Sequence, residues 1–345
     1  LDFDGIKDNL KTFLKQQDEF TDYDFEGSGM NILLDVLAYN THYLGFNANM
    51  LANEMYLDSA DQRSSVVSLA KQVGYTPRSA SSSKATIDVL VNNGSGASIT
   101  MARGTKFTTT VDGTNYSFVN NADVSISPVD GVYKFSNLDI FEGTFLNFKY
   151  TANTSDTDQR FIIPNDNVDT TTLTVKVQES TSDSTTNTYT LAQGITGLDS
   201  TSKVYFLQEV ENGRFEVYFG DGVLGKAIAD GNIIILDYVT CNRDEPNGAT
   251  TFALSGNVGG FTNVTITTVS NASNGDGPET IESIKYNAPR DYTSQDRAVT
   301  ADDYKVLVKS LYANAQSVQV YGGEDAATPD YGKVYISIKA KSGSN

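Results

Sequence analysis

The spacing of apolar residues changes along the chain, and each change marks a new kind of element. From Leu1 to about Gly74 apolar residues recur at intervals of three and four, which predicts helices. From Ala85 to Val239 they alternate with polar residues or form short runs, which predicts strands. Beyond about residue 271 both patterns occur. We therefore expect an α+β, multidomain protein with an N-terminal helical region at 1–78, a β-rich middle domain at 79–270 and an α+β domain at 271–345.

The helical region contains three predicted helices. Asp2 or Asp4 can cap the first, whose apolar face is formed by Phe3, Ile6, Leu10, Phe13 and Leu14. An acidic turn, DYDFEGSG at 22–29, follows it. Ser59 and Gln62 have the spacing of a capping box and predict the start of the third helix. Gly74 and Pro77 are placed to end this helix.

The second helix is the longest, from Met30 to Met55, and spans roughly 39 Å. Two apolar stripes follow its helical period. The first, here called the leucine stripe, contains Met30, Leu33, Leu37, Leu44, Ala48, Leu51 and Met55. The second, here called the aromatic stripe, contains Ile32, Val36, Tyr39, Tyr43, Phe46 and Met50.

The middle region is predicted to contain many short strands. Ser79–Ser83 is a composition break that indicates a linker, and alternation starts at Ala85. Two hairpins are indicated by Asp112-Gly113 and by Asn212-Gly213 between alternating runs. The apolar run 233–239 suits a buried strand, whereas the Ser/Thr-rich segment 180–188 is predicted to be an exposed loop.

The last region mixes helices and strands. A Gly/Asn-rich linker at 271–279 precedes a short helix that Pro278 opens. Thr300 can cap another helix with Asp303 three residues later, and its buried face is predicted to contain Tyr304, Leu307, Val308 and Leu311. Two strands follow at 317–321 and 333–340. We expect this domain to continue past Asn345.

Composition argues against several classes of partner. The formal net charge of −18 and the pI near 4.4 oppose binding to nucleic acid and to anionic membranes. An apolar run long enough to cross a bilayer is absent from the sequence, and no signal peptide is recognisable. The sequence starts at Leu1, not Met, so we expect more protein on either side.

Candidate catalytic chemistry is sparse. The single histidine, His42, lies in the long helix and is predicted to be a surface or interface residue. The single cysteine, Cys241, is predicted to be a small buried residue. We therefore predict no catalytic residues, metal site, cofactor or small-molecule substrate. Gly220-Asp221-Gly222 and Asn274-Gly275-Asp276-Gly277 are both interpreted as turns. A polysaccharide-degrading enzyme stays open, because its two carboxylates leave no sequence signature among 43 acidic residues.

The long helix offers more apolar surface than its neighbours can cover. Its flanking helices are shorter, so we expect them to cover one stripe and another subunit to cover the other. All the residues of both stripes except Ala48 are therefore candidate partner-binding residues. The alternative is a self-contained three-helix bundle.

Three segments resemble a known family. DFEGSGMNILLDVLAYNTHYLGFNANM and DQRSSVVSLAKQVGYTPRS, at 24–50 and 61–79, resemble the N-terminal region of baseplate wedge proteins of T-even-type contractile-tailed phages. FEVYFGDGVLGK at 215–226 resembles a segment of the wider baseplate J-like family. So does 275–308, through Gly277-Pro278-Glu279, Ile281, Arg290, Arg297, Ala298-Val299-Thr300-Ala301 and Asp303-Tyr304.

The resemblance implies a structural virion protein, assembled in the host cytoplasm, and not an enzyme. It implies that a second copy of the chain and other wedge proteins contribute to a shared helical bundle, and that neighbouring wedges join through this protein into a ring around the tail hub. It further suggests that domains rotate as rigid bodies during sheath contraction, with Ser79–Ser83 and Asn271–Gly277 as hinges. A general surface adhesin is a third reading.

Overall fold

The computed structural model describes residues 2–17, 19, 23–24, 26–92, 98–156, 159–192, 194, 197–210, 213–294, 297–312, 315–326 and 328–340. The chain forms two compact units, Leu1–Leu69 and Ala70–Asn345. Helices, a β-rich middle and a C-terminal mixture of helix and strand confirm the predicted α+β, multidomain class. The predicted division into three domains at 78/79 and 270/271 stays a prediction.

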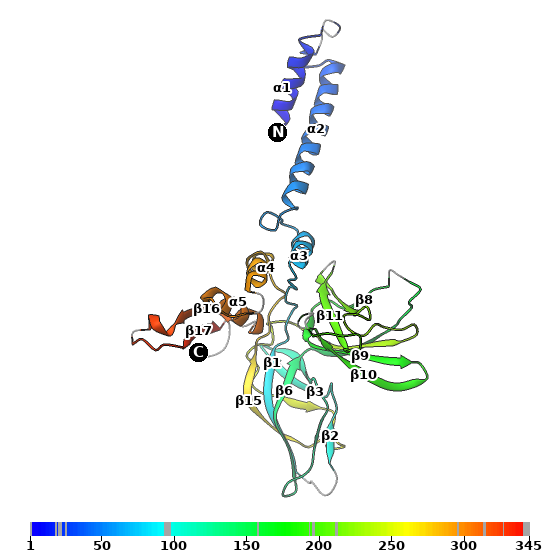
Figure 1. Ribbon diagram of the computed structural model, residues 1–345, viewed down its shortest axis with the longest axis vertical. Helices are drawn as coiled ribbons and strands as arrows, with labels where there is room; N and C mark the ends of the chain where they lie inside the picture. The colour runs from blue at the N-terminus through cyan, green and yellow to red at the C-terminus, as the bar shows by residue number, and fades with distance from the viewer. Residues whose placement is uncertain are drawn as a thin grey trace. The chain divides into compact units, whose positions relative to one another are not determined.

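The first unit is built on two helices, α1 (Phe3–Leu14) and α2 (Gly29–Asn53), which lie alongside each other (Figure 1). Asp2 caps α1 by accepting a hydrogen bond from Gly5 N at 3.0 Å. Ser28 caps α2 by accepting one from Asn31 N at 3.0 Å. The predicted acidic turn between the two helices lies partly outside the described residues.

A third helix, α3 (Arg63–Gln72), starts by a different device from the one predicted. Ser59 Oγ donates to the Asn53 carbonyl, so it does not cap α3. The carboxylate of Glu54 accepts hydrogen bonds from Asp61 N at 2.9 Å and from Gln62 N at 3.3 Å. The predicted capping box is therefore wrong, because an acidic side chain from the end of α2 takes its place. At the other end Gly74 has a φ of 82°, as predicted for a helix terminus.

The second unit contains the sheets. In the part of the chain that the structure describes, they are a six-stranded sheet in the order β14-β3-β4-β6-β1-β15, a seven-stranded sheet in the order β7-β13-β9-β10-β11-β12-β8, and the pairs β16-β17 and β2-β5. The strands span β1 (Lys84–Asn92), β2 (Ile99–Met101), β3 (Lys106–Val111), β4 (Thr114–Asn120), β5 (Val124–Ile126), β6 (Val132–Glu142), β7 (Thr144–Thr151), β8 (Phe161–Ile162), β9 (Val168–Ser180), β10 (Asp183–Leu191), β11 (Val204–Glu209), β12 (Phe215–Phe219), β13 (Ile233–Thr240), β14 (Ala253–Ser255), β15 (Thr265–Ser273), β16 (Ala315–Gly322) and β17 (Val334–Ala340).

The six-stranded sheet confirms two predictions from alternation. Every second residue of β1, from Ala85 to Val91, is buried, and these side chains join one core with Phe107, Phe118 and Phe135. Strands β3 and β4 form the predicted hairpin. Its turn places Asp112 at a φ of 49° and Gly113 at 83°, the backbone of a type I′ turn.

The seven-stranded sheet has a core of its own, which contains Val175, Val217 and Tyr238. Strand β13 is flanked by β7 and β9 and is buried along most of its length, as its continuous apolar run predicts. Strands β11 and β12 form the second predicted hairpin. Its turn was assigned to Asn212-Gly213, and Asn212 lies outside the described residues, while Gly213 has a φ of 73°.

The Ser/Thr-rich segment at 180–188 is not a loop, so this prediction is wrong. Most of the segment belongs to β10, which pairs with the end of β9 across a turn. Threonine is β-branched and favours strands, and an exposed strand face needs no apolar residues. Tyr189, just beyond the segment, is the buried side chain that anchors β10 to the core.

The segment Ser79–Ser83 was predicted to be a linker and is instead buried. Ser79, Ser82 and Ser83 are at most 3% exposed. Ser82 N donates to the Asp169 carboxylate at 2.8 Å, and Ser81 exchanges two backbone hydrogen bonds with Asp276. The hydroxyls of Ser79 and Ser83 also donate hydrogen bonds, to Ala80 O at 2.9 Å and to Asn247 Oδ1 at 2.8 Å. The segment is therefore held by hydrogen bonds within the fold.

The second predicted linker, 271–279, meets the first. Its start belongs to β15, and Asn274 O accepts a hydrogen bond from Ser81 Oγ at 2.8 Å. Arg78 and Asp276 form an ion pair at 2.8 Å. Gly275 is packed so closely that a Cβ would lie 2.0 Å from the Arg243 carbonyl oxygen. The two predicted linkers thus form one bonded junction, and the expectation of flexible connections is wrong.

The C-terminal elements are α4 (Ile281–Ser294), α5 (Ala301–Leu311), the pair β16-β17 and a short 3₁₀ turn, η2 (Gly323–Asp325), with α5 beside β16 (Figure 1). Both strands and the Thr300–Asp303 capping box confirm the predictions. Pro278 does not open α4, which begins three residues later and is longer than expected. The predicted buried face of α5 is correct only in part, because Tyr304, Leu307 and Val308 are half-buried and Leu311 is 87% exposed. Val306, which was not predicted, is buried.

Glu279 holds the junction at the start of α4. Its carboxylate accepts hydrogen bonds from Tyr75 Oη, Arg78 N, Ser283 Oγ and Asn287 Nδ2 at 2.7–3.1 Å. The side chain is 5% exposed, so its donors have little access to water as a substitute. Burial of Tyr75 and the nearby Glu279 charge raise the pKa of the Tyr75 hydroxyl, which stays protonated and donates.

We expect Glu279→Ala to lower the free energy of unfolding by about 3 kcal/mol, because it leaves several buried donors unpaired. Glu279→Gln, which keeps the shape and one carbonyl acceptor, should cost less. Urea unfolding followed by tyrosine fluorescence measures both, since the chain has no tryptophan. An alanine variant as stable as the parent would contradict the role of Glu279.

Candidate functional site

The candidate site is the surface of α2, which has three distinct apolar faces. One face packs against α1 and contains the buried residues Asn31, Leu34 and Ala38, with Ile6 of α1 buried in the same region. This face was not predicted as a stripe. Its signal was present, because Asn31, Leu34 and Ala38 are spaced by three and four residues, but the face is short and contains an amide and an alanine.

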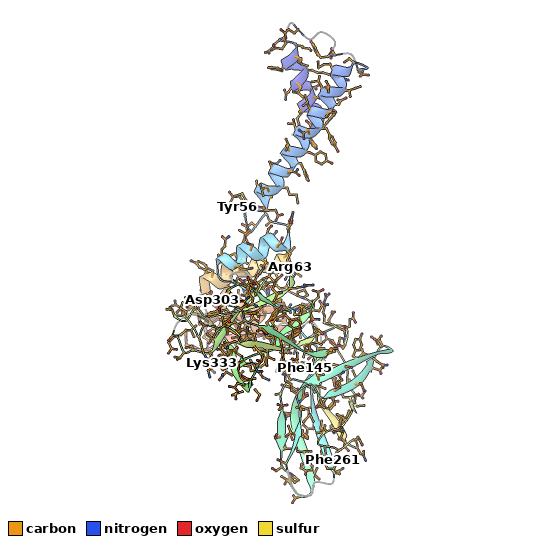
Figure 2. All side chains as sticks on the ribbon, turned by 90° about the vertical axis from the view of Figure 1, so that its right-hand side faces the viewer. Tyr56, Arg63, Phe145, Phe261, Asp303 and Lys333 are labelled. Carbon is orange, nitrogen blue, oxygen red and sulfur yellow. The ribbon has the colours of Figure 1, made fainter. Side chains whose placement is uncertain are left out.

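The leucine and aromatic stripes are both exposed. Figure 2 shows side chains projecting from α2 along most of its length, up to the labelled Tyr56 that follows the helix. Met30 is half-buried, and Ala48 is exposed. The other stripe residues are 43–68% exposed, and they are Ile32, Leu33, Val36, Leu37, Tyr39, Tyr43, Leu44, Phe46, Met50, Leu51 and Met55.

The expectation that the chain's own helices cover one stripe is therefore wrong. The face that α1 covers is a third one. Because each residue of an α-helix is turned by about 100° from the last, the α1 face, the aromatic stripe and the leucine stripe point about 120° apart. Such a helix can pack against three neighbours at once, and α1 supplies one of them.

Burial of the two exposed stripes would contribute a large favourable free energy. Fully burying one large aliphatic or aromatic side chain is worth about 1.5–3 kcal/mol. With eleven such side chains roughly half exposed, burial against other helices would gain on the order of 10 kcal/mol before the cost of association. A contiguous apolar surface of this kind is a candidate site of association.

Charge is almost absent from this surface. Asp35 is the charged residue of α2, and it forms an ion pair with Lys7 of α1. Tyr39 and Tyr43 lie with ring centroids 4.7 Å apart, and the hydrogen bond between their side chains, together with the electrostatic influence of Tyr43, raises the pKa of Tyr39. His42 is half-buried and meets the Tyr43 ring edge-on, as expected of a surface or interface residue.

Two buried carboxylates of the second unit, those of Glu142 and Glu216, form hydrogen bonds with other parts of the fold. Burial raises the pKa of Glu142, although Asn242 donates to it through N and Nδ2 at 2.8 and 2.7 Å. Burial works to raise the pKa of Glu216 as well, but hydrogen bonds from Arg160 and Gln208 lower it. Each carboxylate joins one strand to a neighbouring segment, so its environment is explained by structure alone.

A groove of about 590 Å³ between α4 and α5 also contains two carboxylates, Asp302 and Asp303. The pKa of Asp303 is lowered by its hydrogen bond from Thr300 N, and that of Asp302 by Lys305 at 2.8 Å. Both are thus ionised at neutral pH, and neither can serve as a general acid. Asp303 belongs to the capping box of α5.

The remaining residues that were considered for metal binding or catalysis have structural roles. Among the described residues, His, Cys, Asp and Glu side chains form no group of three or more that could hold a metal ion. Cys241 is buried, as predicted, and burial raises the pKa of its thiol to about 11. Asp221 caps a tight turn by accepting from Val223 N and Leu224 N, both at 2.9 Å. In the part of the chain that the structure describes, no helix combines the length and the hydrophobicity needed to cross a bilayer.

Comparison with known proteins gives three family matches in chain order. "Baseplate wedge protein gp6-like, helical domain" matches residues 2–75. "Bacteriophage baseplate wedge protein gp6, third domain" matches residues 147–247. "Baseplate structural protein gp6, C-terminal domain I" matches residues 300–345.

A curated relative, baseplate wedge protein gp6 of Enterobacteria phage T4, is 31% identical over 372 aligned positions. The alignment covers 99% of this chain and 54% of that protein, so the chain spans about half of the relative's length. A solved structure, the cryo-EM baseplate of the anti-feeding prophage, contains a chain that is similar to this one at 10% sequence identity. The alignment covers 90% of this chain and 57% of that chain. Its TM-score is 0.29.

These matches define the class as a structural protein of the phage tail baseplate. The chain belongs to the gp6-like baseplate wedge family. The predicted resemblance to these wedge proteins is confirmed, while the wider baseplate J-like assignment stays a prediction. The helical match contains all of α2, so the candidate surface lies in a part that the family model recognises.

Leu34 and Leu44 offer a direct test of which face of α2 is buried. Leu34 is 4% exposed and Leu44 is 60% exposed. We expect Leu34→Ala to lower the free energy of unfolding by about 2–4 kcal/mol and Leu44→Ala by less than about 1 kcal/mol in the isolated chain. Unfolding followed by circular dichroism at 222 nm provides the measurement. Equal losses would contradict the assigned packing of α1 on α2.

Proposed function

We propose that this chain is a structural subunit of a phage baseplate wedge whose helix α2 binds helices of other wedge subunits. The partners are a second copy of the chain and other wedge proteins, and the site consists of the leucine and aromatic stripes. The protein resides in the virion tail baseplate after assembly in the host cytoplasm. The observation that carries this proposal is the pair of exposed apolar stripes on a helix with almost no charge.

The chain joins neighbouring wedges into a ring around the tail hub. This role is supported by family membership and by the number of free faces on α2. A subunit that bound one neighbour through one face could form a pair, whereas a subunit with several binding surfaces can link separate assemblies.

On sheath contraction, the second unit moves as one rigid body and so transmits the conformational change. The bonded junction of Ser81, Asp276 and Glu279 supports this part of the proposal. Arg103 adds a link between sheets, because it donates to Thr172 O at 2.9 Å and lies 3.5 Å from the Asp237 carboxylate of β13. A body held together in this way transmits rotation without absorbing it.

The proposed role is not enzymatic and requires no cofactor, nucleic acid, membrane or small-molecule substrate. The alternative function, degradation of polysaccharide, needs a pair of carboxylates poised across a cleft. The buried carboxylates and those of the α4–α5 groove are already engaged in strand contacts, an ion pair and a helix cap. This engagement supports the structural role over the enzymatic one.

The association test uses one charge on each stripe. We expect Leu37→Asp and Tyr43→Asp each to reduce co-purification with co-expressed wedge proteins at least tenfold, because a carboxylate buried in an apolar interface is costly. Asn49→Asp is the matched control, since Asn49 is exposed on α2 and lies outside both stripes. Circular dichroism verifies that all variants fold. Unchanged co-purification of both folded stripe variants would refute the proposal.

The rigid-body role is tested by locking the junction. Ser81→Cys combined with Asp276→Cys places two thiols on residues that exchange backbone hydrogen bonds. We expect phage carrying this disulfide to contract and infect as well as phage carrying either single substitution. If oxidation of the pair blocks contraction and reduction restores it, the junction must open, and the rigid-body proposal fails.

A further inference from the structure

The seven-stranded sheet has a second face, which is open to solvent. Val175, Val217 and Leu236 point into the core from one side of the sheet. Because side chains alternate along a strand, the residues beside them point to the opposite side, here called the outer sheet face. The strands β9, β10 and β11 of this sheet are labelled in Figure 1. One row across the outer sheet face, here called the lysine row, contains Lys149 of β7, Ile235 of β13, Lys176 of β9 and Thr188 of β10.

The lysine row presents positive charge to solvent. Lys149 is exposed, and the side chain of Lys176 is 34% exposed. The neighbouring carboxylate of Asp237 is buried, lies 3.1 Å from Lys176 Nζ and is 3.5 Å from the Arg103 guanidinium. Three cations thus surround one buried carboxylate, so the exposed charge in the middle of this face is positive.

The other carboxylates that the described strands place on this face leave that positive charge in place. Glu216 is buried and accepts hydrogen bonds from Arg160 at 3.0 and 2.7 Å, while the Arg160 side chain is 47% exposed. Asp169 is buried. Asp183 is exposed but lies at the β9–β10 turn, roughly 13 Å along β9 from Lys176. On a chain with a net charge of −18, this face therefore attracts negatively charged groups that the rest of the chain repels.

A tightly bonded loop at 220–225 holds two aliphatic side chains in solvent. A Cβ on Gly220 would lie 2.3 Å from the Leu224 carbonyl oxygen, so the loop can fold back this closely only over glycine. The Asp221 carboxylate accepts hydrogen bonds from Val223 N and Leu224 N, both at 2.9 Å. Val223 is nevertheless 70% exposed, and Leu224 is 41% exposed. A loop that is already ordered loses little conformational entropy on binding, so these side chains are suited to anchor a partner.

The loop is continuous with an aromatic pair and with the lysine row. Phe206 and Tyr218 face each other across β11 and β12 with ring centroids 5.2 Å apart, and Tyr218 is 42% exposed. Val204 lies on the same face, where a Cβ on Gly225 would be 3.0 Å from its Cγ2. It pairs with Thr190, two residues beyond the lysine row on β10. Five strand spacings of about 4.8 Å separate β7 from β12, so this surface extends roughly 24 Å along the sheet.

We infer that the outer sheet face binds an acidic segment of another baseplate protein. The partner's carboxylates lie at the lysine row, and its apolar side chains contact Tyr218, Val223 and Leu224. Charge complementarity selects this occupant, because the row attracts carboxylates. The apolar half of the surface favours a protein over a nucleic acid, whose phosphates the rest of the chain repels. The inference takes from the proposed function only that the partner is a baseplate protein, and it assigns a binding surface separate from α2.

Site-specific photo-crosslinking tests the surface in the full chain, co-expressed with the other baseplate proteins. The photoreactive residue p-benzoylphenylalanine replaces Tyr218 in one variant and Val129 in the control, because Val129 is 71% exposed and lies next to the six-stranded sheet. We expect position 218 to crosslink about tenfold more than position 129. Mass spectrometry should place the crosslink in a partner segment in which Asp and Glu outnumber Lys and Arg. Because α2 holds the complex together separately, the crosslink reports on the sheet face alone.

Charge reversal tests the lysine row. Lys149→Glu places a carboxylate in the row and leaves the ion pair of Lys176 in place. Lys106→Glu is the matched control, since Lys106 is an exposed lysine on β3 of the other sheet. We expect crosslinking from position 218 to fall about tenfold with Lys149→Glu and less than about twofold with Lys106→Glu. Circular dichroism verifies that both variants fold.

The possible results separate the outer sheet face from α2. A crosslink to a basic or uncharged segment, or to nucleic acid, would overturn the inference, and so would unchanged crosslinking with Lys149→Glu. If position 218 crosslinks to none of the baseplate proteins while Leu37→Asp abolishes association, the sheet-face inference fails and the proposed function stands. If Leu37→Asp and Tyr43→Asp both leave association intact while position 218 crosslinks to an acidic segment, the proposed role of α2 fails and the sheet-face inference stands.

Discussion

The whole arrangement depends on one constraint, namely that α2 has three apolar faces and its own unit covers one. Helix α1 has 12 residues against 25 in α2, so it cannot wrap its longer partner. Helix packing is pairwise, and each further face needs a further helix. The first unit by itself therefore leaves two apolar faces of α2 exposed to solvent.

In contrast to α2, the second unit buries apolar side chains within its own fold. Its sheets have separate cores, and buried polar residues join the segments between them. Glu279 is the clearest case, since its carboxylate gathers donors from the chain just before the first sheet and from the start of α4. Hydrogen bonds in such a buried network reinforce one another and fix one arrangement. The buried hydrogen bonds of Glu279 therefore account for how these segments are arranged within the second unit.

The sequence predicted most of the fold wherever local pattern decides it. The alternation of β1, the Asp112-Gly113 turn and the length of α2 follow from side-chain period and turn chemistry alone. Residues 79–83 and 271–279 were misread because Ser, Gly and Asn occur both in flexible linkers and in tightly bonded junctions. Only the three-dimensional partners, Asp169 and Asp276 among them, separate the two cases.

The candidate surface was predicted residue by residue, but its packing was not. Periodicity identified both stripes, yet it could not reveal that Leu34 and Ala38 form the face that α1 takes. Helix α1 takes a face that belongs to neither stripe, and both stripes stay exposed. The reason is geometric. The face that α1 covers is short and includes an amide and an alanine, so it stands out less in a hydrophobic pattern than the larger side chains of the stripes.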